Sequence, residues 1–500
     1  MSFADVSDRG SHPRHGLGSR LSDLVNPILV REVQQAVKGR VFPWAILIAL
    51  AVSVVIASVV SAEDRGVVNG RGVFSAGLAT LAPLLLFVVP MQAYNSMRTE
   101  LRGGIVEQLL MTRLGPGRVL IGKLQAAMVQ FLLYVSLLAP LLATSYLLRG
   151  VDLPTIAVSL FFAFVACLTA TAFAISSAAQ AIVPALQAIA NLGMAFGLGV
   201  ATLGAVVAIA GGDYTQLIGA LIRSGQLTVT LTAVTLAATV SVTLSWLTAR
   251  SYLLHTFEDK SSGFRVFLWA LPVLVYGWMC AFVERAYWSE VFPSLTVGLL
   301  LMGIGFGVFM VTEQRALSPR VRHHVPKGGL TSALAAPLLP GRDRGMLCFT
   351  AFALFLLAVG WSFWPQGGLG ERGPDLVARV GLMIFAYGLF YLNAGRWLRG
   401  LLPETVPGSQ AGRVVMPVLL FACIVVPLLV DGLRGGYVGE WHWGHVLNPF
   451  WTTVHAVSDR WVDAQPVVLG ALVVLSLAQL PLWIRGVGEV TRASAALRRR

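Results

Sequence analysis

One glycine-rich string in this chain has almost the spacing of a nucleotide-binding loop. Gly117 and the pair Gly122-Lys123 stand at the glycine and lysine positions of a P-loop, in which backbone N–H groups and a lysine hold phosphates. Leu124 stands where that motif needs a Ser or Thr hydroxyl for magnesium, and no strand precedes the string. The string also runs into an apolar segment. We therefore expect no nucleotide site here, and we expect Lys123 to extend its ammonium to the lipid headgroups as a boundary anchor.

Three histidines near residue 450 have a spacing that can hold a metal. His442, His445 and His455 carry imidazoles that zinc and copper accept as ligands, but no Cys or tight carboxylate pattern completes a set. They lie in an aromatic-rich segment, 434–465, which we expect on the outer membrane surface, with a ligand lid as the alternative. No Ser/His/Asp set, paired-carboxylate arrangement or dinucleotide loop is visible. The sequence therefore predicts no catalytic residue, no metal site and no enzyme activity in this chain.

The composition indicates a membrane protein. Of the 500 residues, 56% are hydrophobic and only 12% are charged, whereas a soluble domain carries about 25% charged residues. A net charge of +13 would suggest nucleic acid as the partner of a soluble protein. Here Lys and Arg collect in segments on the predicted cytoplasmic side, while Asp and Glu divide evenly between the two sides. The charge thus indicates topology and contact with lipid headgroups, and it gives no support to nucleic-acid binding.

Apolar stretches of about 20 residues, the length that crosses a bilayer, recur along the whole chain. They predict an all-α polytopic protein with about 12 transmembrane helices in two six-helix halves and both termini in the cytoplasm. We expect a disordered segment at 1–20, a first membrane domain at 21–250, a polar inner linker at 251–264 and a second membrane region at 265–500. The predicted spans are 43–61, 74–95, 119–147, 154–180, 184–211, 225–249, 265–283, 291–312, 346–364, 377–395, 413–433 and 466–484.

An amphipathic helix is predicted just before the first span. Asn26 is a good N-cap, and Pro27 suits the first helical position. Apolar residues share one face of the segment, while Arg31 and Glu32 belong to the polar face. Such a helix can lie on the inner leaflet and turn into the membrane near Pro43.

The loop after the second span is short, basic and too polar for lipid. Gly103 and Gly104 break the chain before it, and Gly115-Pro116-Gly117 break it afterwards. Ile105–Leu114 can form about three turns of helix between these breakers. A small stiff helix on a cytoplasmic loop is suited to receive a push from a soluble partner.

These two segments carry a resemblance. The string Asn26-Pro-Ile-Leu-Val-Arg-Glu32 resembles the elbow helix of type-2 ABC transporter permeases. The stretch Glu100…Gly104-Ile-Val-Glu107-Gln-Leu-Leu-Met-Thr112, followed by Gly122-Lys123, resembles the most recognisable segment of that family. The resemblance covers about residues 21–250. The usual permease of the family ends near there with six spans, so the second half is a departure.

The resemblance implies a permease that pairs with a separate ABC ATP-binding subunit. That subunit would hold ATP and magnesium, while this chain would bind no cofactor. The helix 105–114 would dock in a cleft of the subunit, with Glu107 facing a basic group and Leu110 as an apolar anchor. The docking residues implied by position are Arg98, Glu100, Gly104, Glu107, Leu110, Thr112, Arg113 and Pro116.

Uncharged polar residues toward the inner ends of the early spans have two possible uses. Gln92, Asn95, Gln187 and Asn191 can line a pathway or join helices by hydrogen bonds. Because the spans hold almost no ionisable residue, energy is expected to come from elsewhere. We expect an ABC exporter permease of a bacterial inner membrane, in contact with lipids and with a second copy or accessory membrane subunits. A secondary transporter and a non-transporting assembly scaffold are the alternatives.

Overall fold

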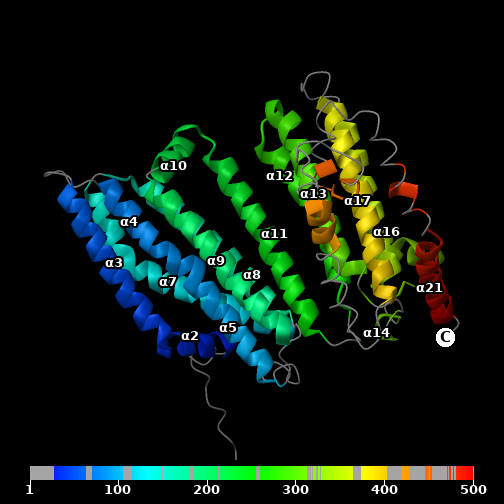
Figure 1. Cartoon of the computed structure of the whole chain (residues 1–500), viewed down its shortest axis with the longest axis horizontal. Helices are drawn as coiled ribbons and strands as arrows, with labels where there is room; N and C mark the ends of the chain where they lie inside the picture. The colour runs from blue at the N-terminus through cyan, green and yellow to red at the C-terminus, as the bar shows by residue number, and fades with distance from the viewer. Residues whose placement is uncertain are drawn as a thin grey trace, which may run out of the picture. The chain divides into compact units, whose positions relative to one another are not determined.

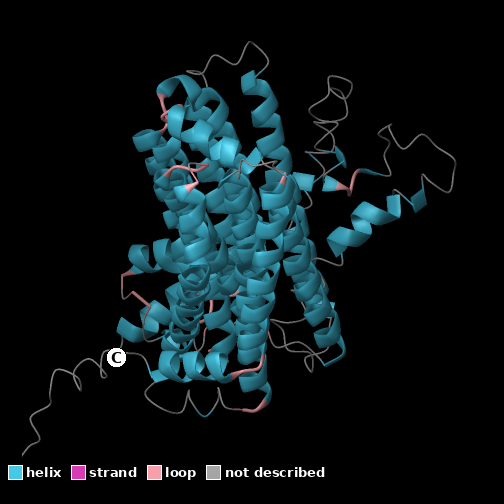
Figure 2. Cartoon of the chain, turned by 90° about the vertical axis from the view of Figure 1, so that its left-hand side faces the viewer, coloured by secondary structure: helices cyan, strands magenta, loops and turns pink. Residues whose placement is uncertain are grey.

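The described part of the chain is built from helices and loops, without a strand. Figure 2 shows this by secondary structure. The all-α prediction is therefore confirmed for this part. The computed structural model describes residues 27–63, 70–104, 108, 115–148, 150–180, 184–211, 213–254, 259–311, 313, 317, 319–322, 325–326, 328–363, 373–401, 419–427, 429–430, 445–449, 451–452, 470, 472–474, 477 and 480–498.

The described helices belong to two compact units. Helix α11 (Leu227–Leu253) contributes Ser241–Ala249 to the first unit and its other residues to the second. The rest of the first unit is made of α2 (Pro27–Lys38), α3 (Val41–Glu63), α4 (Gly70–Pro83), η1 (Leu84–Val88), α5 (Val89–Arg102), α7 (Pro116–Leu147), α8 (Leu153–Ala179), α9 (Pro184–Ala210) and α10 (Asp213–Arg223). The rest of the second is made of α12 (Ser262–Phe282), η2 (Arg285–Tyr287), α13 (Trp288–Val311), α14 (Pro319–Arg322), α15 (Gly329–Ala335), η3 (Ala336–Leu338), α16 (Arg342–Phe363), α17 (Gly373–Leu401) and α21 (Leu480–Arg498).

Among the described residues, eight helices are long and apolar enough to cross a membrane, or nine if α2 and α3 count as one bent span. Each of the eight overlaps a predicted span. The predicted number of twelve in two equal halves is not confirmed. Helix α17 covers the predicted span 377–395 but is not among the eight, and the predicted spans 413–433 and 466–484 are described only in part.

The outward faces of the helices in the first unit are apolar. On α9, Leu192 and Phe196 are more than 70% exposed, and on α3 Ile48 is 59% exposed. Faces this apolar would be unfavourable in water and match a lipid environment. Inside the unit, Phe74, Leu81 and other side chains pack without exposure. These exposed faces support a multi-pass membrane protein.

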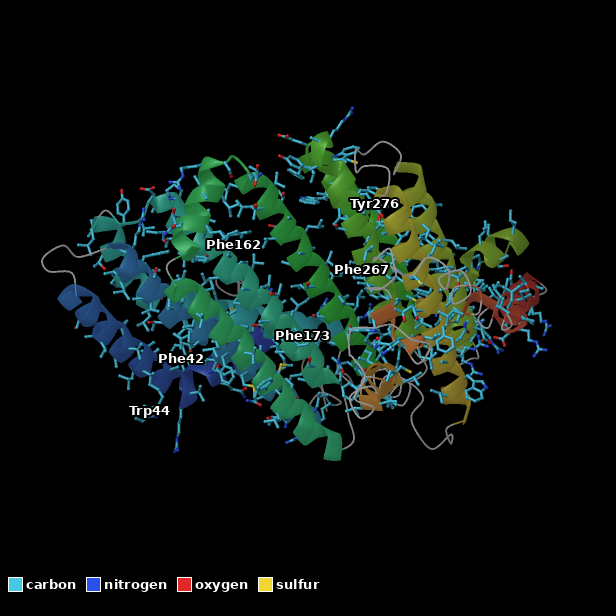
Figure 3. All side chains as sticks on the ribbon, turned by 45° about the horizontal axis from the view of Figure 1, so that its top comes forward. Phe42, Trp44, Phe162, Phe173, Phe267 and Tyr276 are labelled. Carbon is cyan, nitrogen blue, oxygen red and sulfur yellow. The ribbon has the colours of Figure 1, made fainter. Side chains whose placement is uncertain are left out.

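The helix α2 forms at the predicted place and bends by 57° from α3 (Figure 1). The break lies at Gly39-Arg40, not near Pro43, which the first turn of α3 accommodates. Phe42 and Trp44, both labelled in Figure 3, lie two residues apart in α3 and therefore on different faces of this helix. Phe42 lies 5.4 Å from the ring of Tyr134, while Trp44 is 64% exposed. The position of α2 on a leaflet stays a prediction.

The second span contains a π-helical turn that sequence reasoning missed. Gly70–Arg102 forms one span of 33 residues, in which η1 separates α4 from α5. Pro83 directly precedes this turn and Pro90 follows it. Neither proline can donate a backbone hydrogen bond, so the regular α-helical ladder is interrupted on both sides. The wider turn holds one residue more than an α-turn does.

At the start of α4, the backbone of Gly70 and Arg71 lies in close contact with the backbone of Gly150. A Cβ atom on Gly150 would lie 2.3 Å from the backbone carbon of Gly70 and from the backbone nitrogen of Arg71. The Arg71 side chain also donates a hydrogen bond to the Gly150 carbonyl at 3.3 Å. Only glycine permits this approach. The contact fixes the start of α4 against the segment that joins α7 to α8.

Candidate functional site

A buried charged cluster lies where the loop after α5 begins and ends. Helix α5 leads into this loop, α7 leads out of it, and α2 packs against α7. The cluster consists of Arg31 and Glu32 from α2, Ser96 and Glu100 from α5, and Lys123 from α7. Residues that are distant in the sequence thus share one site.

Lys123 is the centre of the charged cluster. Its ammonium nitrogen lies 2.6 Å from Glu32 Oε1 and 2.8 Å from Glu100 Oε2, and it donates to Ser96 Oγ at 2.7 Å. Ser96 in turn donates to Glu32 Oε2 at 2.8 Å. Arg31 completes the cluster by pairing with the carboxylate of Glu100. Two carboxylates therefore face two cations, and the cluster as a whole is neutral.

The charged cluster is shielded from solvent. Lys123 is 2% exposed, Glu100 5% and Glu32 8%, while the Arg31 side chain keeps 38% exposure. Removing one member of such a pair leaves a buried charge without compensation, which costs about 3–5 kcal/mol. The cluster therefore favours one arrangement of α2, α5 and α7.

This arrangement overturns two expectations. Lys123 does not extend to headgroups as a boundary anchor, because its side chain is enclosed by the two glutamates. Glu32 is buried and does not belong to a solvated face. The available signal was the four-residue spacing of Ile28, Glu32 and Ala36, which places one carboxylate on the inward stripe of α2.

A polar cavity of about 270 Å³ lies beside the charged cluster. Gln92 and Asn95, two of the predicted pathway residues, line it together with Glu32, Lys123 and Gln130. Both polar atoms of the Gln92 side chain are buried without a hydrogen-bond partner within the described structure. The cavity can therefore hold water or a small polar group that the amide would bind.

The other two predicted pathway residues belong elsewhere. Asn191 accepts a hydrogen bond from the Tyr94 hydroxyl at 2.6 Å, so it joins α9 to α5. The Arg98 guanidinium lies 5.8 Å from the ring centre of the same tyrosine. Gln187 lies in α9, among residues whose side chains are not described. Asn191 thus serves the helix contact that the sequence left open as an alternative.

The predicted docking residues divide into three groups. Arg98 and Glu100 are buried in the bundle, with 7% and 5% exposure. The breakers are where they were expected: α5 ends at Gly103, Gly104 has a φ of +67°, and Pro116 opens α7. Glu107, Leu110, Thr112 and Arg113 lie outside the described residues, as does the elbow residue Asn26, so their roles stay predictions.

The second unit has a buried ion cluster of its own, which sequence reasoning also missed. Arg265, fully buried at the start of α12, lies 3.1 Å from Glu313 Oε2 and donates to the carbonyl of Gly341 at 3.0 Å. Arg344, at the start of α16, lies 3.2 Å from Glu489 Oε2 of α21. Between α13 and α16, the described residues form only the short helices α14, α15 and η3, and the ion pair of Arg265 with Glu313 ties that segment to the start of α12.

In the described ranges no group of three or more His, Cys, Asp or Glu residues could hold a metal ion. His442 and His455 lie outside those ranges, while His445 is buried 5.8 Å from the ring of Trp451. The four cysteines are not paired.

The chain was compared with known proteins by sequence and by structure. No family model, no curated protein and no solved structure matches it.

Proposed function

We propose that this chain is the permease subunit of an ABC exporter, driven by a separate ATP-binding subunit through the loop helix 105–114. The observation that carries the proposal is the place of the charged cluster, which joins the helix before that loop, the helix after it and α2. The sequence resemblance over residues 21–250 gives the partner its class. The proposal also places this multi-pass protein in a bacterial inner membrane, with both termini in the cytoplasm.

The charged cluster gives the loop a way to move several helices together. Glu100 lies at the end of α5, and Lys123 lies about 10 Å along α7 from its start. A force on the loop reaches both helices, and their ion pair keeps them in register. Glu32 extends the same connection to α2. The partner, which binds ATP and magnesium, would supply the force by closing on itself.

The experiment requires the full chain together with a candidate partner, a P-loop ATPase sought among the neighbouring genes. In lipid vesicles, Glu107→Lys and Leu110→Asp are expected to weaken complex formation at least about tenfold, because each removes a predicted contact worth more than 1.4 kcal/mol. The readouts are complex formation and ATP hydrolysis as a function of ATPase concentration.

Glu284→Lys is the matched control, since it makes the same charge change at an exposed residue just beyond α12. It should leave both readouts unchanged. Unaltered binding in the two docking variants, with normal expression, would falsify the docking role. A complex that never forms with the wild-type chain would remove the ABC assignment altogether.

A second candidate is a proton-coupled secondary transporter. The observation in its favour is that Glu100 and Lys123 lie in membrane-span candidates and are buried beside a polar cavity. Ionisable residues inside spans mark proton pathways in such transporters, and the sequence had predicted almost none. A secondary transporter would work in vesicles with an imposed proton gradient and no ATPase. The ABC proposal predicts no transport under those conditions.

A further inference from the structure

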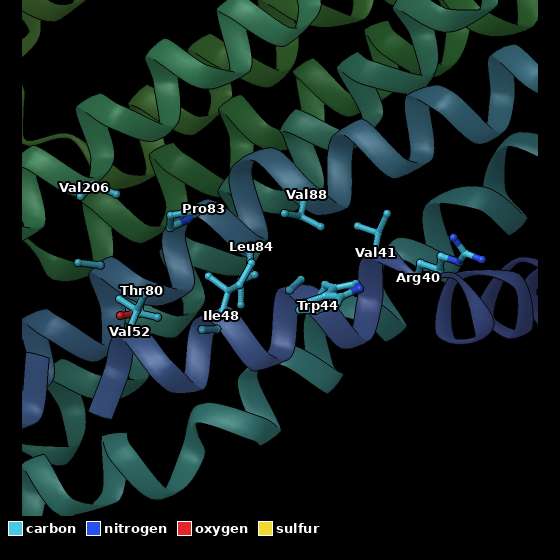
Figure 4. A pocket seen from close by; sticks show the side chains of 13 residues that line it. Arg40, Val41, Trp44, Ile48, Val52, Thr80, Pro83, Leu84, Val88 and Val206 are labelled. Carbon is cyan, nitrogen blue, oxygen red and sulfur yellow. The ribbon is translucent and has the colours of Figure 1, made fainter. Parts of the chain in front are cut away.

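A long apolar groove runs along α3, apart from the charged cluster. It has a volume of about 690 Å³, within the range of small-molecule sites. One wall is α3, with Trp44, Ile48 and Val52, and the other comes from α4, η1 and Val206 of α9. Figure 4 shows these side chains along the groove, with Arg40 at one end.

The lining of the groove matches a hydrocarbon chain. Apart from Arg40 at its end, only Thr80 and Trp44 among the lining residues have a side chain with a polar atom. The Thr80 hydroxyl is satisfied within its own helix, because it donates to the Ala76 carbonyl at 2.8 Å. The walls therefore offer a ligand dispersion contacts and few hydrogen bonds.

The length of the groove matches one leaflet of a bilayer. From Val41 to Val52, α3 rises about 17 Å. Half of a hydrocarbon core of about 30 Å is about 15 Å. An acyl chain that starts at the Arg40 end would thus fill the groove to about the bilayer midplane.

Charge sets the chemistry of the headgroup. Arg40 is exposed at the end of the groove, in the break between α2 and α3, and no carboxylate of the described residues pairs with it. A guanidinium binds phosphate oxygens through paired N–H groups. A lipid whose chain lies in the groove would bring its phosphate to this residue.

The π-helical turn explains why the groove exists. Pro83, Leu84 and Val88 line it; Pro83 directly precedes η1, and Leu84 and Val88 are its first and last residues. An irregular turn cannot present the even ridges that would let α3 pack closely against it. The space remains open between helices whose outer faces are already apolar.

We propose that this groove is a binding site for one anionic phospholipid of the inner leaflet, with an acyl chain along α3 and the phosphate at Arg40. The proposal depends on the chain being in a membrane and does not depend on the ABC assignment. The proposal predicts that one lipid stays bound to the purified protein, whereas the lipids around the other helices exchange with the bilayer.

The test is native mass spectrometry of the purified full chain, titrated with phosphatidylglycerol and with phosphatidylcholine. One phosphatidylglycerol is expected to stay bound at collision energies that strip other lipids. Ala45→Phe and Ile48→Trp fill the groove and are expected to lower the lipid-bound fraction about tenfold, a change of one decade in affinity. Leu47→Phe, on the exposed face of α3 and outside the groove, is the matched control and should retain the lipid.

The headgroup is tested separately. Arg40→Gln is expected to reduce the preference for phosphatidylglycerol over phosphatidylcholine about fivefold, the contribution of one basic residue at an anionic membrane. Lys38→Gln, an exposed cation of α2 that does not line the groove, should leave the preference unchanged.

Two outcomes would overturn the proposal. One is equal lipid retention by the wild type and both groove-filling variants, with unfolding temperatures confirming that all are folded. The other is a second copy in the groove, detected as a disulfide-linked dimer of the Ile48→Cys variant with no retained lipid.

Discussion

At the scale of single residues, a partner distant in the sequence determines whether a charged side chain is buried or exposed to solvent. Lys123 and Glu32 are 91 positions apart, and no local pattern links them. Hydrophobic periodicity separates polar from apolar residues, but it treats a paired carboxylate and a solvated one alike. The glycines and prolines around the loop were predictable because their effect on the backbone is local.

Lys123→Met is expected to destabilise the first unit by about 3–5 kcal/mol, because Glu32 and Glu100 would remain buried without their shared cation. Unfolding in detergent by heat or denaturant measures the change. Adding Glu32→Gln to Lys123→Met removes one of the two uncompensated carboxylates. The double variant should therefore lose less unfolding free energy than the sum of the two single variants. Lys38→Met, which removes an exposed cation of α2, should change stability little. Strict additivity of the two buried changes would contradict the pairing.

At the scale of helices, the sequence predicted where most described spans lie, because a run of apolar residues is a local property. It did not predict how they pack. The π-helical turn, the bend at Gly39-Arg40 and the backbone contact at Gly150 arise from the meeting of separate segments. Local composition does not predict contacts between distant segments. Only the prolines beside η1 indicated an interruption of the helix.

Gly150→Ala tests the close helix contact. The added methyl group would overlap the backbone of Gly70 and Arg71, and a loss of about 1–3 kcal/mol is expected. Thermal unfolding, followed by circular dichroism in detergent, provides the measurement. Gly193→Ala is the control, since a methyl group added at this position of α9 would meet no atom within 4 Å. That variant should gain up to about 1 kcal/mol from helix propensity, and a similar loss in both would refute the contact.

At the scale of the whole molecule, the low content of charged residues and the recurring apolar stretches were the most useful signals. They identified a multi-pass membrane protein, and the described helices agree. These signals could not fix the number of spans, since a helix such as α17 combines an apolar stretch with the buried side chain of Arg396. The distribution of Lys and Arg also predicts an orientation.

Labelling from one side of the membrane tests that orientation. In a background where Cys280 and Cys423 are replaced by Ser, an impermeant maleimide added to intact cells should react with the Glu284→Cys variant. The Lys38→Cys variant should react only after the cells are opened. Both positions are exposed, so access depends on the side of the membrane alone. The reverse pattern would place the predicted docking loop outside the cell.

The extra residue in η1 has an effect far from where it sits. Successive residues of an α-helix are rotated by about 100°, and Glu100 lies about 18 Å beyond the turn. Without the surplus residue, the face of α5 that carries Ser96 and Glu100 would be rotated by about a quarter of a revolution, away from Lys123. The charged cluster that joins α2, α5 and α7 therefore depends on one additional residue within the second span. Deleting one residue there would turn Glu100 away from Lys123, although every member of the cluster would still be present in the sequence.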